Sequence, residues 1–244
     1  SRNIGKQVAE IYQQMAIDDI SGKSNFKQDS EKLIAEYKKC KREREISKAI
    51  KELKQSYKTN TTKIPRELSY LVGKHREMYL HDMKLCQEFA KINRRIIQST
   101  ICYYMCWEVT KETERFQTIH NYIEYDTNIV RKGAISAKTG EKVLIPINMR
   151  DGCILGIGKG NEDWNYSAPH GAGRTMSRSK AKESILLEEY QKAMDGIFTT
   201  SVNTSTIDES PMAYKTMDEI IGNIKDTVEI VDIIKPIYNF KANE

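Results

Sequence analysis

The sequence predicts an α+β fold, with helices first and a mainly antiparallel β-sheet with flanking helices after them. Up to about residue 110, apolar residues recur at helical spacing along highly charged segments. After Arg115, short apolar runs alternate with turn residues, which is typical of strands. The 244 residues, 39% of them hydrophobic, suffice for the core of one domain. We therefore expect 1–110 to form the helical region and 111–244 the β-rich part of the same domain.

The first 65 residues are expected to contain two helices. The first is amphipathic and is indicated by apolar residues at helical spacing, Ile4, Val8, Ile11 and Met15. A polar connector is expected at 21–30, which contains Gly22. The segment 30–57 reads as a charged helical insertion with a narrow apolar stripe. Its basic residues can be read in two ways: they face RNA, or they form a solvated helical surface. The alternation of Glu with Lys and Arg is typical of the second.

A second connector is expected at 57–62, and a long helix from 66 to 108, broken once near Gly73. On that helix, His75 and His81 are read as surface or packing residues. Strands are then expected at 116–124, 128–137, 141–147 and 153–157, with a hairpin turn at 138–140. The remainder is expected to contain helices at 179–194 and 214–225, a loop at 199–210, and a β-rich end at 228–240.

The bulk composition limits the environment of the protein. Apolar runs stay shorter than the roughly 18–20 residues of a membrane span, and residues 1–20 lack the pattern of a signal peptide. Five cysteines, an odd number without zinc-type pairing, indicate a reducing and therefore cytoplasmic compartment. The net charge of +5 permits a polyanionic partner.

The run from Asp163 to Arg178 carries the clearest chemical signal. His170 is followed by the small residues Gly171-Ala172-Gly173, whose bare backbone can approach a phosphate or a base closely. Arg174 and Arg178 lie four residues apart, so a helix that starts near 176–177 would point both at one anion. This pattern suits phosphoryl or nucleotidyl transfer through a histidine adduct. The alternative is a glycine-rich turn with a structural histidine.

Four segments carry a resemblance to a known family. Ser167-Ala-Pro-His-Gly-Ala-Gly-Arg, followed by Met-Ser-Arg, is similar to the signature of the RtcB family of RNA-splicing ligases. Thr118-Ile-His-Asn-Tyr-Ile resembles that family's metal-binding segment. Arg131-Lys-Gly-Ala with Val143-Leu-Ile-Pro resembles its central strand pair, and Glu209-Ser-Pro-Met-Ala-Tyr-Lys its late motif. The order and spacing match, and the sequence opens just past a family histidine, so we expect the C-terminal portion of an RtcB-like fold.

The resemblance implies an enzyme that joins an RNA 3′-phosphate or 2′,3′-cyclic phosphate to a 5′-hydroxyl, in tRNA splicing or RNA repair. It implies GTP and manganese(II) as cofactors, a histidine–GMP intermediate on His170, and an archease-like activating protein as a further partner. Because the family's earlier metal ligands are missing from this sequence, the isolated chain is expected to be inactive. The alternative is a non-catalytic RNA-binding or scaffold remnant of the family.

The resemblance also assigns roles to individual residues. His170 is the expected catalytic nucleophile and His120 the expected metal ligand. The nucleotide is expected to contact Asn148, Cys153, Gly171, Ala172, Gly173, Tyr214 and Lys241. RNA or phosphate is expected to contact Arg2, Asn121, Arg174 and Arg178.

One segment departs from the family pattern. The expected nucleotide loop reads Pro146-Ile-Asn-Met-Arg-Asp-Gly152, where the family has Pro-Gly-Ser-Met-Gly-Thr. Ile147 replaces a flexible glycine, a charged Arg150-Asp151 pair appears, and Cys153 falls where a serine is expected. The departure leaves the nucleotide preference open and admits a divergent subfamily with a different RNA substrate.

Overall fold

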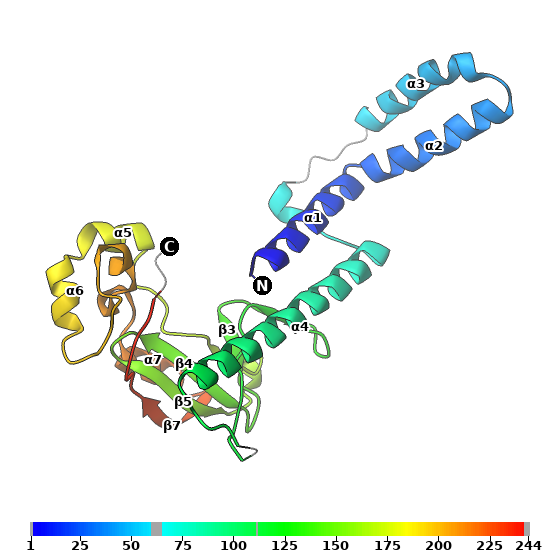
Figure 1. Cartoon of the computed structure of the whole chain (residues 1–244). Coiled ribbons are helices and arrows are strands. Elements are labelled where there is room, and N and C mark those ends of the chain that lie inside the picture. The colour runs from blue at the N-terminus through cyan, green and yellow to red at the C-terminus, as the bar shows by residue number, and fades with distance from the viewer. Residues whose placement is uncertain (1, 60–64, 111, 242–244) are drawn as a thin grey trace. The chain divides into compact units, whose positions relative to one another are not determined.

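The computed structural model describes residues 2–59, 65–110 and 112–241 (Figure 1). The chain divides into two compact units, 1–110 and 111–244. The first is helical, and the second contains small antiparallel sheets with short helices, so the predicted α+β class is confirmed. Among the described residues, no helix has the length and apolar character that crossing a membrane requires.

In the first unit, α1 (Arg2–Ile20) packs along α4 (Gly73–Tyr104). The Tyr12 hydroxyl donates to Asp82 Oδ2 at 2.7 Å, and His75 Nδ1 lies 2.5 Å from Asp19 Oδ2. His75 is thus half-buried in the helix pair, while His81 is exposed. These polar contacts fix the register of the two helices.

A helical hairpin follows α1, formed by α2 (Lys23–Lys39), the 3-10 helix η1 (Glu43–Glu45) and α3 (Ile46–Thr59) (Figure 1). The expected connector at 21–30 is wrong. Only the turn at 21–22 separates α1 from α2, because Gly22 adopts φ 73° there. Phe26 in α2 then packs edge-on against Tyr57 in α3, with the ring centroids 5.5 Å apart. The single helix expected over 30–57 is also wrong, since it breaks at 40–42, where Lys41 has φ 57°.

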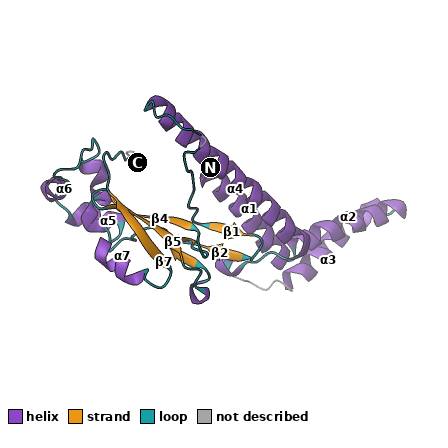
Figure 2. Ribbon diagram, turned by 90° about the horizontal axis from the view of Figure 1, so that it is seen from below, coloured by secondary structure: helices purple, strands orange, loops and turns teal. Residues whose placement is uncertain are grey.

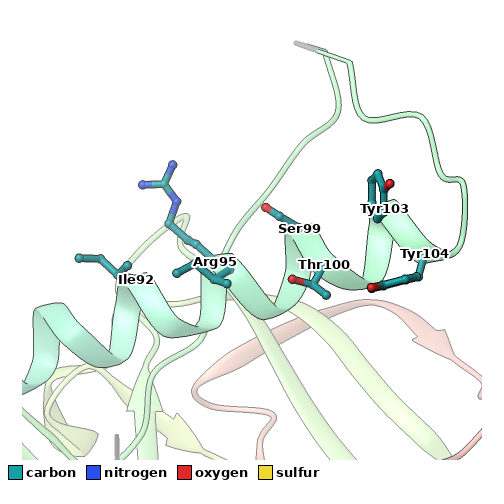
Figure 3. A pocket seen from close by; sticks show the side chains of 7 residues that line it. Ile92, Arg95, Ser99, Thr100, Tyr103 and Tyr104 are labelled. Carbon is teal, nitrogen blue, oxygen red and sulfur yellow. The ribbon is translucent and has the colours of Figure 1, made fainter.

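The long helix starts later than expected. A short 3-10 helix, η2 (Arg66–Leu68), precedes α4, which runs from Gly73 to Tyr104 rather than from 66 to 108. Of the expected connector at 57–62, residues 57–59 are helical and 60–62 lie outside the described residues. The last three turns of α4 have a groove of about 600 Å³, shown in Figure 3 and lined by Ile92, Arg95, Ile96, Ser99, Thr100, Tyr103 and Tyr104.

The second unit contains three small antiparallel sheets. β1 (Tyr122–Glu124) pairs with β2 (Ile129–Arg131), and β3 (Ala134–Ser136) pairs with β6 (Ser167–Pro169), a strand that the sequence analysis missed. The largest sheet has the order β4 (Lys142–Asn148), β5 (Gly152–Gly158), β7 (Val228–Ile234) (Figure 2). The strand expected at 116–124 is shorter, and the one at 128–137 is interrupted at Gly133, which has φ 69°.

Side chains alternate along β4 and β5, so that one face of the largest sheet is buried. This face forms the main core with α7 (Met217–Asn223). Its most buried members are Val143, Ile145, Ile154, Ile224 and Ala137.

A second core lies under the segment that follows the His170 motif. The single helix expected at 179–194 is two helices, α5 (Arg178–Ser184) and α6 (Leu187–Ala193). They separate at 185–186, where the extended backbone lets Ile185 enter the core beside the fully buried Tyr190. The loop expected at 199–210 contains the 3-10 helix η4 (Thr204–Glu209), which is followed by η5 (Pro211–Ala213).

Gly152 provides a stability test, because it begins β5 at φ 85° and an added Cβ would lie 2.0 Å from the Ile234 carbonyl oxygen in β7. We expect Gly152→Ala to lower the free energy of opening of this sheet by roughly 2–4 kcal/mol. The measurement is amide hydrogen exchange in β5 and β7. Gly222→Ala in α7 is the matched control, since no atom lies within 4 Å of its added Cβ. Equal protection in both variants would refute the close approach.

Candidate functional site

His170 follows β6 directly, and its ring is fixed by the backbone of a neighbouring strand. Its Nδ1 lies 2.7 Å from the carbonyl oxygen of Gly133. A carbonyl can only accept, so Nδ1 carries the proton and the neutral ring keeps its lone pair on Nε2. The structure therefore places a half-buried imidazole with a defined tautomer in the glycine bend.

Asn121 binds the backbone N–H of the same glycine. Its Oδ1 accepts the Gly133 N–H at 2.8 Å, and its own backbone is left-handed at φ 56°. Asn121 thus holds the 132–133 peptide group, next to the 133–134 peptide group whose carbonyl orients His170. The resemblance implied one of two roles for Asn121, support of the metal ligand from behind or contact with an RNA end, and both stay predictions.

His120 lies against His170. The two ring centroids are 4.9 Å apart and the ring planes differ by 15°, so the imidazoles are stacked. The structure brings together the expected nucleophile and the expected metal ligand, which are 50 residues apart in sequence. Within the described ranges, no three His, Cys, Asp or Glu side chains are grouped to bind a metal ion. The donor set present thus fits manganese(II) only as one imidazole nitrogen.

His170 lines a cleft of about 690 Å³, a volume in the range of small-molecule sites. All seven residues expected to contact a nucleotide line the same cleft, namely Asn148, Cys153, Gly171, Ala172, Gly173, Tyr214 and Lys241. The remaining wall comes from β4, the end of β7 and the segment after it, including Lys235 and Asn239.

The bend after His170 is packed against β4. The Ala172 N–H donates to the Pro146 carbonyl at 3.0 Å, and a Cβ on Gly171 would lie 3.1 Å from the same oxygen. Gly173 has φ 73°, and its carbonyl accepts the N–H of Lys215 at 3.2 Å. The close approach at Gly171 and the left-handed backbone at Gly173 therefore favour small residues in this bend.

The segment expected to be a nucleotide loop is a tight hairpin between β4 and β5. Asn148 closes it, because its Oδ1 accepts the N–H groups of Arg150 and Asp151 at 3.0 and 2.8 Å. Its amide nitrogen donates to Asp151 Oδ2 at 2.7 Å. The side chain at 148 thus serves the turn, while the residue also lines the cleft, so its expected contact with a nucleotide stays a prediction. Cys153 is partly buried beside it, and burial raises the pKa of its thiol.

Arg174 and Arg178 converge as expected, but on two carboxylates of η4. Arg174 Nη2 lies 2.7 Å from Glu209 Oε1, and its Nη1 donates to the Asp208 carbonyl oxygen at 2.6 Å. Arg178 Nη1 lies 2.5 Å from Asp208 Oδ2 and 2.9 Å from Glu209 Oε1. The helix α5 starts at Arg178, with Ser177 as its N-cap, between the expected starts near 176–177 and at 179.

Tyr214 and Lys241 meet at the other oxygen of Glu209. The Tyr214 hydroxyl donates to Oε2 at 2.8 Å and accepts from Arg174 at 2.9 Å, while Lys241 Nζ lies 3.2 Å from Oε2. Burial, together with the hydrogen bond to Glu209, raises the pKa of Tyr214 to about 12. Burial alone would raise the pKa of Glu209, but Tyr214 and the cations outweigh it and lower that pKa.

Two carboxylates in this cluster face four cationic side chains, which are Arg174, Arg178, Lys182 and Lys241. These six side chains together carry a charge of +2, and Arg174 and Lys241 are the two of the four cations that line the cleft. Asp208 is 3% exposed, and its pKa is lowered: the Arg178 hydrogen bond and the Lys182 charge overcome the opposing effect of burial. The cluster can therefore attract an anion while its cations stay in fixed positions.

A family model described as tRNA-splicing ligase RtcB matches residues 1–242. The chain belongs to the RtcB family. An RNA-splicing ligase RtcB of Escherichia coli is 29% identical over 213 residues, which cover 81% of this chain and 51% of that protein. A tRNA-splicing ligase RtcB of Aeropyrum pernix is 41% identical over 86 residues, which cover 33% of this chain and 18% of that protein. The chain thus spans about half the length of the Escherichia coli relative.

The RtcB motifs seen in the sequence come together in the second unit, except for Arg2. Arg2 begins α1 in the first unit, and its side chain lies outside the described part of the structure. Sequence reasoning missed the roles of Asp208 and Glu209. Their signal was the charge pattern itself, because two adjacent acids stand just before the Pro-Met-Ala-Tyr-Lys motif that brings Tyr214 to the cleft.

Sequence reasoning also missed how Gly133 is anchored. Arg131, 2% exposed, donates to Glu124 Oε2, Tyr122 Oη and Ser167 Oγ, each at 3.0 Å. These bonds connect β1, β2 and β6, two residues before the carbonyl that binds His170. Burial opposes ionisation of Glu124, yet bonds from Lys138, Thr127 and Arg131 lower its pKa to about 2.

Glu124 should therefore make stability depend on pH. A carboxyl with a native pKa of about 2 and an ordinary unfolded pKa near 4.5 contributes fully above pH 4.5. That contribution is lost as the pH falls towards 2. We expect Glu124→Gln to unfold at lower temperature than the wild type at pH 6, with the gap closing towards pH 2. Thermal unfolding from pH 2 to 6 measures this, with the exposed Glu188→Gln as control. A gap independent of pH would contradict the assignment.

Proposed function

We propose that this chain forms the nucleotide- and RNA-end-binding part of a GTP- and manganese(II)-dependent RNA ligase. The enzyme would join an RNA 3′-phosphate or 2′,3′-cyclic phosphate to a 5′-hydroxyl through a histidine–GMP intermediate. The observation that carries the proposal is His170, whose tautomer is fixed by Gly133 and whose ring lines the cleft. The family membership supports the RNA substrate, since the relatives are named RNA-splicing and tRNA-splicing ligases.

In the first proposed step, Nε2 of His170 attacks the α-phosphorus of GTP. A phosphorus–nitrogen bond forms, the bond to the bridging oxygen breaks, and pyrophosphate leaves with the electron pair. The ring becomes positively charged, and the Gly133 carbonyl stabilises that charge by accepting the Nδ1 proton in a hydrogen bond. His120 would bind manganese(II), which offsets phosphate charge when bound.

In the next two steps, an oxygen of the RNA 3′-phosphate attacks the phosphorus of the adduct and displaces His170. The 5′-hydroxyl of the second RNA end then attacks the RNA 3′-phosphorus, loses its proton and displaces GMP. A 2′,3′-cyclic end must first take up water to become a 3′-phosphate. We assign Arg174 and Arg178 to the phosphates in these steps, because both guanidiniums stand in fixed geometry beside the cleft.

The proposed physiological setting is tRNA splicing or RNA repair in the cytoplasm, with an archease-like protein as an activating partner. Tyr214 and Lys241 would contact the guanosine moiety from the wall formed with Glu209. The hairpin at Asn148 lines the cleft with a sequence that departs from the family's loop, which leaves room for a different nucleotide preference.

The second candidate is a non-catalytic RNA-binding or scaffold protein. The observation that favours it is the lack, among the described residues, of three grouped metal-binding side chains. We accordingly expect this chain to form no adduct alone. A protein that combines it with the other metal ligands of the family should form one if the ligase proposal is right.

The first test is adduct formation by that combined protein with labelled GTP and manganese(II). We expect a GMP adduct that is stable to base and labile to acid, because protonation makes imidazole a good leaving group. His170→Ala should abolish it, and His75→Ala, a half-buried histidine of the first unit, should leave it unchanged. Label retained by His170→Ala would overturn the nucleophile.

A second test separates RNA binding from adduct formation. Arg178→Ala should slow end joining about tenfold or more while sparing the adduct, since a charge-assisted phosphate contact is lost. His120→Ala should suppress both, because the metal would be lost. Lys180→Ala on the same helix is the control, as its side chain is exposed. If Arg178→Ala and His120→Ala reduce the adduct equally, the two roles are assigned wrongly.

A further inference from the structure

The helical hairpin formed by α2, η1 and α3 carries the basic character of the whole chain. Residues 23–59 contain 12 Lys and Arg against 6 Asp and Glu, a net charge of +6. The whole chain has 39 basic and 34 acidic residues, a net charge of +5. The remaining residues thus contain 27 basic and 28 acidic side chains and are nearly neutral. The positive charge of the chain is therefore concentrated in this hairpin, which points to a function of the hairpin itself.

The excess lies on two exposed surfaces of the hairpin. One is the stretch from the end of α2 into η1, where Lys38, Lys39, Lys41, Arg42 and Arg44 are all exposed. Glu45 partly neutralises this surface, because it binds Arg42 through two hydrogen bonds of 2.9 and 2.5 Å. The other surface lies on α3 and contains three exposed lysines.

The α3 lysines form one row. Lys48, Lys51 and Lys54 follow each other at intervals of three residues, so they lie on one side of the helix and span about 9 Å along its axis. On the opposite side of α3, Ala49 is buried and Ile50 and Leu53 are half-buried in the hairpin. The apolar side thus fixes the helix against α2 and leaves the lysine row turned towards solvent.

We propose that the α3 lysine row, Lys48, Lys51 and Lys54, is an RNA-binding surface that contacts the phosphate backbone of the substrate away from the ends that react. The proposal rests on the ligase function, which makes RNA the partner. Charge complementarity selects it, because regularly spaced lysines on a rigid helix match a chain of phosphates and read no base. Like other basic arms, the row raises affinity without taking part in chemistry.

The test is the salt dependence of RNA binding by the 244-residue chain. The probe is a labelled RNA oligonucleotide that ends in a 3′-phosphate. The combined variant Lys48→Gln, Lys51→Gln, Lys54→Gln should reduce the magnitude of the negative slope of log affinity against log salt by about 2, as expected for three lost phosphate contacts. Glutamine keeps the helix propensity, and circular dichroism checks that the hairpin stays folded.

The matched control changes three lysines of α4 by the same substitution, Lys74→Gln, Lys84→Gln and Lys91→Gln, all exposed. An unchanged slope in the α3 variant, or an equal fall in the control, would overturn the proposal. Polyglutamate is the competitor that represents an acidic protein. If it displaces the RNA as well as unlabelled RNA of equal charge does, the surface is not selective for RNA and the proposal fails.

The hairpin proposal and the ligase proposal fail in different experiments. The α3 variant should form the GMP adduct at the wild-type level when the metal site is complete, because the row lies outside the cleft residues. A wild-type salt slope with an intact adduct would therefore refute the hairpin alone. An adduct that survives His170→Ala would refute the ligase mechanism and leave the salt measurement to decide the hairpin.

Discussion

The candidate site depends on one hydrogen bond, from Nδ1 of His170 to the carbonyl oxygen of Gly133. It exists because β3 and β6 pair antiparallel, with Ala134 opposite Pro169, which brings the preceding glycine beside the following histidine. Gly133 can turn its carbonyl this way because its φ of 69° is accessible to glycine. A local pairing of two three-residue strands thus determines which ring nitrogen is available for chemistry.

Two sets of contacts stabilise that pairing. Asn121 binds the Gly133 N–H, and buried Arg131 connects β1, β2 and β6 through side-chain hydrogen bonds. A buried guanidinium is tolerable only when its donors are satisfied, and here Glu124 supplies the compensating charge. The geometry of His170 is therefore determined by groups that need not touch a ligand themselves.

The opposite wall of the cleft is organised by carboxylates. Glu209 contacts Arg174, Arg178, Tyr214 and Lys241, so four groups from three separate segments are positioned by one side chain. An anion that binds there meets cations whose orientation is already fixed, which reduces the entropy lost on binding. The same carboxylates lower the positive potential of the cluster. They therefore weaken the attraction for an anion while they hold the cations in position for it.

The sequence predicted well where the signal was local. The strands at β4 and β5 follow from alternating apolar residues, and the start of α5 follows from Ser177. The predictions from sequence failed where long-range packing determines the secondary structure. After Gly22, contact between Phe26 and Tyr57 stabilises a helical hairpin where a connector was expected. The cleft residues came from motif resemblance. The adjacent acids Asp208 and Glu209 are visible in the sequence, but only the folded chain shows that Glu209 meets Arg174 and that Gly133 meets His170.

The most direct measurement of the central claim is the tautomer of His170, by nitrogen NMR of labelled protein at a pH where the imidazole is neutral. We predict a protonated Nδ1 and an unprotonated Nε2, because the Gly133 carbonyl can only accept a hydrogen bond. A proton on Nε2 with a bare Nδ1 would contradict it, since the nitrogen assigned to attack phosphorus would then have no lone pair available.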